Sequence, residues 1–309
     1  MSKILKYHEF ITEGISNVIK KYVDEIYDVF LAGELTIIED DLILNDINLP
    51  LRQYVIYFIE NEDITDNSYH GANNPNKSKI DNSNNLTNIQ ITINYPKNFN
   101  NIKIKEIIAH ELSHVKEYYE YVKSVLRIKI TTPNKKVLTQ SWVTINGIRK
   151  NMSIYNKSNH NMDSIFDKFL YFVYLSLDNE LNARVTQLYP YIKSLNSVDY
   201  NTILNNVMQH DIYALYTSLK SFNAKVFIKE MVNNIELPAL LKLTNEFNNK
   251  IISSGVKSQV KLLNSLPITI STVDDVEQFY HTFEKIFHIR TDKHLSKIKD
   301  IIKEFINDQ

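Results

Sequence analysis

Apolar residues recur at intervals of three and four positions between residues 104 and 122. They are Ile104, Ile108, Leu112, Val115, Tyr119 and Val122. This spacing matches the period of an α-helix with one face in a core. The sequence therefore predicts an amphipathic helix here.

The pattern before this helix is that of β-strands. Residues 35–38, 53–59 and 88–95 are rich in β-branched and aromatic side chains, and the last stretch alternates Ile with polar residues. Residues 66–88 are polar and rich in Asn, which predicts a long loop. We expect residues 89–95 to form a sheet edge to which an extended peptide could add as a further strand.

The pattern after the helix is mixed and then helical. Residues 125–130, 137–145 and 148–155 predict a small antiparallel unit, with turns at Pro133-Asn134 and Asn146-Gly147. A helix is expected from residue 163 to about 189, ending at Pro190. Residues 198–309 have helical periodicity almost throughout and end in two segments, 274–287 and 292–306. A further helix is expected at 15–30.

Composition narrows the class of protein. The 309 residues include only 5 Gly and 7 Pro, which favours a largely helical chain. The formal net charge is -1, so we expect no general attraction to nucleic acid or to an anionic membrane. The longest apolar run, residues 169–177, is too short to cross a bilayer. We therefore expect a cytoplasmic protein.

The chemistry of the chain is concentrated in His110, Glu111 and His114, a His-Glu-x-x-His motif on the predicted helix. A spacing of four places both imidazoles on one side of a helix, where they can bind one ion. Glu111 is rotated by about 100° from His110, which suits a general base that holds a metal-activated water. The chain contains no Cys, so any metal must be held by His and carboxylates.

A catalytic zinc site usually has three protein ligands, so a third must come from elsewhere. Glu180 is the preferred candidate, because it interrupts a strongly apolar helix where a carboxylate needs a partner. The alternative is a surface Glu180 paired with Arg184 one turn later. Glu117 is a rival ligand, but about 10.5 Å of helix axis separates it from His110. The other His residues have no spacing that ties them to the motif; they are His8, His70, His160, His210, His281, His288 and His294.

The motif, followed 66 residues later by Asn179-Glu180-x-x-Ala183, resembles the gluzincin branch of the zincin metallopeptidases. The resemblance implies that His110, His114 and Glu180 bind Zn²⁺, that Glu111 is the general base and acid, and that the reaction is peptide-bond hydrolysis. Many gluzincins have Asp four residues after the ligand Glu, whereas this chain has Arg184. That supporting role could fall to Asp178 or another group. Candidates for stabilising an oxyanion are Tyr189, His210 and Arg184.

The expected fold class is α+β: a zincin-like catalytic core with a small mixed β-sheet and the motif helix, followed by a mainly helical C-terminal region. Residues 14–195 would form the core and residues 196–309 the helical region. Residues 1–13 resemble the cleavable head-targeting leaders of large tailed phages, because Ile11-Thr12-Glu13 precedes Gly14.

Three functions are consistent with these features. The first is a zinc metallopeptidase acting on a peptide or protein substrate. The second is a virion-associated structural or interaction protein with an inactive zincin fold, which would contact phage head components. The third is a helical binding module in which the motif is accidental and no metal binds.

Overall fold

The structure is a computed structural model, and it describes residues 17–32, 37–40, 54–61, 69–73, 79–80, 86–87, 89–127, 160–253, 266 and 269–309. The chain forms two compact units. Unit 1 comprises residues 1–133, 182–210 and 296–309, and unit 2 comprises residues 134–181 and 211–295. The predicted leader and the predicted strands at 137–145 and 148–155 lie outside the described residues.

Unit 1 contains a four-stranded mixed sheet in the order β1-β2-β6-β3. Its strands are β1 (Ile37–Asp40), β2 (Tyr54–Glu60), β6 (Ile89–Tyr95) and β3 (His70–Asn73). The strands β2 and β6 are parallel, whereas β1 and β3 pair antiparallel with β2 and β6 respectively. A separate two-stranded sheet pairs β4 (Lys79–Ile80) with β5 (Leu86–Thr87).

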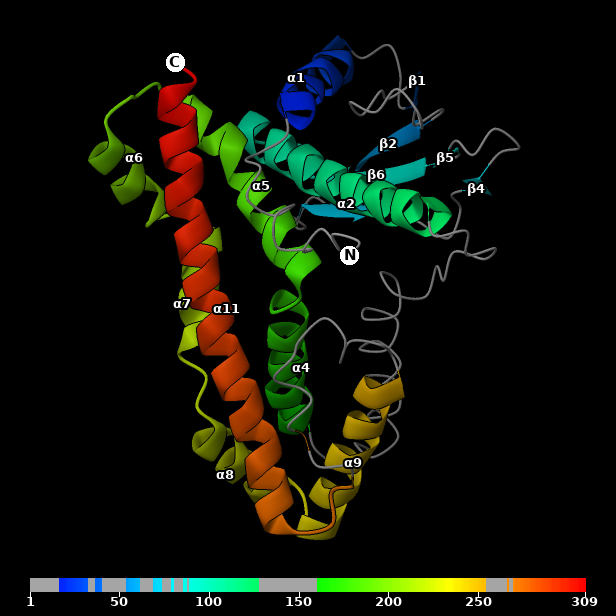
Figure 1. Ribbon diagram of the computed structural model, residues 1–309, viewed down its shortest axis with the longest axis vertical. Helices are drawn as coiled ribbons and strands as arrows, with labels where there is room; N and C mark the ends of the chain where they lie inside the picture. Colours follow the sequence, from blue (N-terminus) through cyan, green and yellow to red (C-terminus); the bar gives the residue numbers. More distant parts are fainter. Residues whose placement is uncertain are drawn as a thin grey trace, which may run out of the picture. The chain divides into compact units, whose positions relative to one another are not determined.

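One face of the four-stranded sheet is apolar and buried. Ile56 pairs with Ile91, and Phe58 pairs with Ile93, so alternation along both strands places all four side chains on this face. All four are at most 5% exposed. Helix α2 (Asn101–Arg127) packs on β6 and β3, and α1 (Asn17–Ala32) packs on α2. Figure 1 shows α2 lying along the sheet.

Unit 2 is a helical bundle with an aromatic core. Its helices are α4 (His160–Leu175), α7 (Asp211–Lys220), α8 (Ala224–Asn234), α9 (Leu237–Ser253) and most of α11 (Val273–Asn307). The ring of Phe169 lies at the centre, with its centroid 5.1 to 6.0 Å from those of Phe227, Tyr280, Phe283 and Phe287. Burial raises the pKa of Tyr280, whose hydroxyl lies 3.2 Å from that of Thr244.

The α+β class and the mainly helical C-terminal region are confirmed. The remaining helices are α5 (Asp178–Ser194) and α6 (Tyr200–Val207). Within the described part of the chain, no helix combines the length and apolar character needed to cross a membrane.

Two predictions about the sheet are wrong. Residues 66–88 were expected to be a loop, but they contain β3, β4 and β5. Residues 89–95 were expected to be a sheet edge, but β6 is an interior strand because β3 pairs with its outer side. The short sequence His-Gly-Ala-Asn of β3 has little β propensity of its own, so pairing with β6 decides its conformation.

Three helix boundaries also differ from expectation. Helix α2 continues through Arg127, so the strand predicted from residue 125 is wrong over its first three residues. The helix expected at 163–189 is two helices, and Pro190 lies inside the second. At the break, Ser176 Oγ donates to the carbonyl of Val173 at 2.7 Å, which competes with regular helical bonding. The two segments predicted at 274–287 and 292–306 are one helix, α11.

A carboxylate on α1 joins three helices of unit 1. Asp24 Oδ1 lies 2.7 Å from Lys105 Nζ of α2, and its Oδ2 lies 2.7 Å from Lys193 Nζ of α5. Burial by itself would raise the pKa of Asp24, but hydrogen bonds and charge from both lysines outweigh it and lower that pKa. The charged form of Asp24 is therefore stabilised by folding.

We expect Asp24→Asn to lower the free energy of unfolding at pH 7 by about 1 kcal/mol, since partly exposed ion pairs contribute roughly 0.2 to 1 kcal/mol each. The pKa is lower in the folded protein, so this stability is present above the ordinary value of 3.8 and is lost as the pH falls below it. Urea unfolding at pH 7 and at about pH 3 measures the difference. Asp28→Asn, on the same helix, is the control, and an equal effect of Asp24→Asn at both pH values would contradict the assignment.

Candidate metal centre

The buried apolar face of α2 fixes the orientation of this helix about its own axis. Ile104, Ile108, Leu112 and Val115, four members of the predicted apolar stripe, are 0 to 3% exposed. The helix begins with Asn100 as its cap, because Asn100 Oδ1 accepts hydrogen bonds from the backbone N–H groups at positions 102 and 103. Rotation of the helix would expose this apolar face, so the directions of the polar residues beside it are determined.

The two histidines of the motif converge. His110 Nε2 and His114 Nε2 are 3.1 Å apart, and the two rings meet edge to face with centroids 4.7 Å apart. Two nitrogens bound to one tetrahedral Zn²⁺ at about 2.0 to 2.1 Å lie roughly 3.3 Å apart. The separation of the two nitrogens therefore fits a shared ion.

Glu180 completes a group that could hold a metal ion. It stands in the first turn of α5, two residues before the part of that helix that belongs to unit 1. One ligand atom from each of His110, His114 and Glu180 lies within 4.8 Å of the others. Glu180 is 0% exposed, which the alternative of a surface carboxylate does not allow. Arg184, its partner in that alternative, donates to Gln187 Oε1 at 3.1 Å.

Glu111 follows His110 in the helix, and its side chain lies against the sheet. It is 3% exposed, and its carboxylate adjoins Gly71 of strand β3. The residue therefore points toward the sheet while His110 and His114 converge on each other. Two imidazoles and one carboxylate are in position to bind a cation, and the residue after His110 supplies a second buried carboxylate that can accept a proton.

The other histidines have different surroundings. A Cβ at Gly71 would point at α2, so alternation turns His70 to the opposite face of the sheet. His281 Nδ1 lies 2.8 Å from Glu284 Oε2, and His294 stacks on Tyr216 with ring centroids 3.5 Å apart. His288 is exposed, whereas His8 and the side chain of His160 lie outside the description. Among the described residues, His110, His114 and Glu180 are the group found with metal-binding spacing.

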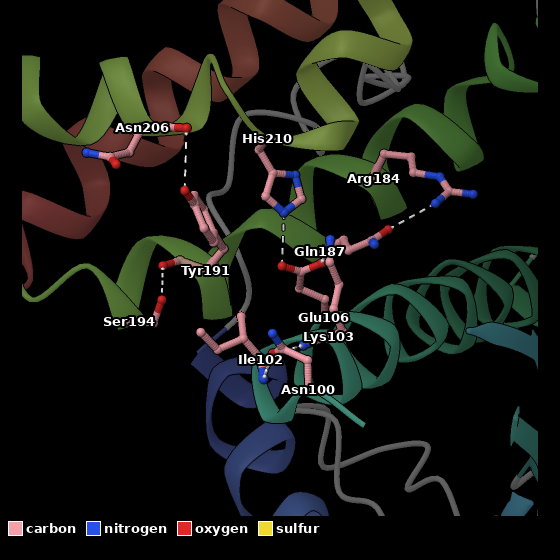
Figure 2. Close-up of polar contacts among 10 residues, drawn as sticks. All are labelled: Asn100, Ile102, Lys103, Glu106, Arg184, Gln187, Tyr191, Ser194, Asn206 and His210. Carbon is pink, nitrogen blue, oxygen red and sulfur yellow. Dashed lines mark hydrogen bonds and ion pairs between the residues drawn. The ribbon is translucent and has the colours of Figure 1, made fainter. Parts of the chain in front are cut away.

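Sequence reasoning missed a buried contact between a carboxylate and an imidazole one turn before His110. Glu106 is 0% exposed, and its Oε1 lies 3.0 Å from His210 Nε2, while its Oε2 lies 3.2 Å from Lys103 Nζ. Figure 2 shows Glu106 and His210 facing each other, with Tyr191 beside the His210 ring at a centroid distance of 4.6 Å. The available signal was an acidic residue within the apolar face of the helix, but its partner is 104 residues away.

The candidates for oxyanion stabilisation have other contacts. His210 is the partner of Glu106, and Arg184 contacts Gln187 (Figure 2). Tyr189 packs edge to face on Phe305 with centroids 6.2 Å apart. Tyr189 also lines a groove of about 360 Å³ formed by α1, α2 and α5. The residues that line this groove do not include His110, His114, Glu111 or Glu180. The side chains of Glu117 and Asp178 lie outside the description.

Comparison with protein families, with curated proteins and with solved structures found no match.

We expect Glu106→Leu to lower the free energy of unfolding by about 3 kcal/mol, because it leaves His210 buried without its carboxylate. The double variant Glu106→Leu/His210→Phe should recover most of this loss, since an apolar pair replaces a buried polar one and leaves no polar group without its partner. Urea unfolding of all four proteins of the cycle measures the coupling. Lys103→Ala is the control and should cost less than about 1 kcal/mol, because Lys103 is partly exposed. Additive losses at positions 106 and 210 would contradict the assigned pairing.

Proposed function

We propose that this protein is a zinc metallopeptidase of the gluzincin type. The observation that carries the proposal is the convergence of the His110 and His114 ring nitrogens with the buried carboxylate of Glu180. The residue after His110 is Glu111, whose carboxylate is also buried. A gluzincin needs these four groups, and the chain supplies them from two helices, α2 and α5.

The donor set favours zinc over harder cations. Two imidazoles and one carboxylate are a common catalytic zinc set, whereas Ca²⁺ and Mg²⁺ prefer oxygen ligands. A set of three protein ligands leaves room for water or substrate. The chemistry that zinc supplies in such sites is the activation of water and the polarisation of a carbonyl group.

Glu111 is the proton carrier in this proposal. It is adjacent in sequence to the ligand His110 but rotated toward the sheet, which keeps its carboxylate available for proton transfer. Glu111 would accept the proton of the attacking water and then deliver it to the nitrogen of the departing amine. The bond formed is between the carbonyl carbon and the water oxygen, and the bond broken is the peptide C–N bond.

The sheet edge beside Glu111 supports a peptide substrate. Strand β3 is the terminal strand in the sheet order, and residues 70–72 are exposed. An extended peptide can add to such an edge through backbone hydrogen bonds, which place its carbonyl groups without requiring a particular sequence. The edge to which a substrate strand would add is therefore β3, and not residues 89–95.

One feature of many gluzincins differs in this chain. They have Asp four residues after the ligand Glu, and that position is Arg184, which contacts Gln187. The proposal therefore assigns no supporting role to position 184.

We expect purified wild-type protein to contain about one zinc per chain. His114→Ala and Glu180→Ala should each remove one ligand and lower the zinc content severalfold at the same free zinc concentration. Mass spectrometry of the metal content measures this directly. His281→Ala is the control and should retain its zinc, because His281 contacts Glu284 instead. Wild-type protein that stays metal-free after zinc loading would refute the proposal.

We expect zinc-loaded wild type to cleave members of a broad peptide library, and Glu111→Gln to reduce kcat by at least about 100-fold while retaining zinc. The amide has nearly the shape of the carboxylate but cannot accept the proton. Mass spectrometry of the digested library detects the cleavage, and metal content is measured on the same samples. Full activity in Glu111→Gln would remove Glu111 from the mechanism.

A further inference from the structure

Strand β3 has a glycine at the position that faces the motif helix. Gly71 pairs with Ile93 of β6, on the buried face where α2 packs. A Cβ atom added at Gly71 would meet Oε1 of Glu111 at a separation that real Cβ atoms do not show. It would also lie 2.8 Å from Cγ of Glu111 and 2.8 Å from Cγ2 of Ile107. The space of the missing side chain is therefore occupied by Glu111.

The backbone does not explain this glycine. Gly71 lies in a regular antiparallel pairing between His70 and Asn73, and its φ is outside the left-handed region that favours glycine. Its neighbours His70 and Ala72 carry side chains on the opposite face, where they are exposed. What distinguishes position 71 is the close approach of the helix.

The movable partner in this contact is the Glu111 side chain. Hydrogen bonding to β6 holds the backbone of β3, and the buried face of α2 holds the helix. Ile107 is 8% exposed and branched, so it has few alternative rotamers. An added methyl group at position 71 would therefore displace the carboxylate of Glu111.

We propose that Gly71 is a positioning residue for Glu111: by lacking a side chain, it lets β3 lie directly against the carboxylate of the general base. This inference rests on the proposed peptidase function. A substrate strand would pair with β3, and the Glu111 carboxylate packs on β3. The backbone of β3 would therefore position both groups relative to each other. A displacement of about 1 Å in such a group can reduce the rate roughly 100-fold.

The contact can be tested without enzymatic activity. We expect Gly71→Ala to lower the urea midpoint of unfolding when residue 111 is Glu, and to lower it much less when Glu111 is replaced by Ala. The clash with Ile107 is present in both backgrounds and cancels in the comparison. Ala72→Ser is the matched control on the opposite face of β3 and should shift the midpoint little in either background. Equal shifts for Gly71→Ala in both backgrounds would overturn the proposal.

The role in positioning is tested by kinetics on the zinc-loaded protein. We expect Gly71→Ala to retain about one zinc per chain and to lower kcat at least tenfold with KM little changed. Glu111→Asp has a shorter side chain, so adding Gly71→Ala to it should cause little further loss of kcat. An unchanged kcat in Gly71→Ala would overturn the positioning role.

The two measurements separate the two proposals. Should the wild type cleave no peptide, the peptidase proposal fails, and with it the role of Gly71 in catalysis. The coupling of positions 71 and 111 in the unfolding experiment then still decides whether Gly71 holds the Glu111 carboxylate in place.

Discussion

The packing of α2 on the sheet is the constraint on which the site depends. Ile104, Ile108 and Leu112 of the helix are buried, as are Ile91 and Ile93 of β6, on which the helix packs. Burying such a side chain contributes about 1.5 to 3 kcal/mol, so turning the helix by one residue would forfeit several of these contributions. The apolar face therefore sets the directions in which His110, Glu111 and His114 point.

Four polar side chains among the described residues of this helix are buried. Glu106, His110, Glu111 and Ser113 are at most 7% exposed. Buried charges are costly unless they have partners. Glu106 contacts two partners within the protein, His210 and Lys103. His110 and His114 converge with Glu180, and these three residues could hold a metal ion. The same helix thus holds the buried contact between Glu106 and His210 and, one turn later, a candidate metal centre.

Elements with strong internal periodicity were predicted well from the sequence. Helices α1 and α2, strands β2 and β6, and the helical C-terminal region follow from local patterns. Elements that depend on partners were not predicted. Strand β3 has four residues with little β propensity, and its antiparallel pairing with β6 stabilises it. Helix α5 continues past Pro190 to Ser194, since burial of Ile192 stabilises the last turn despite the missing N–H.

The sequence by itself determined the local geometry of the site. Its spacing of four residues puts His110 and His114 on one side of a helix, and the lack of Cys restricts any metal ligands to His and carboxylates. Only the tertiary structure decided which distant groups join them. It brings Glu180 from α5 to the histidines, places Gly71 against Glu111, and pairs Glu106 with His210. The physical reason is that helical period is a property of neighbouring residues, whereas these approaches depend on how buried faces pack together.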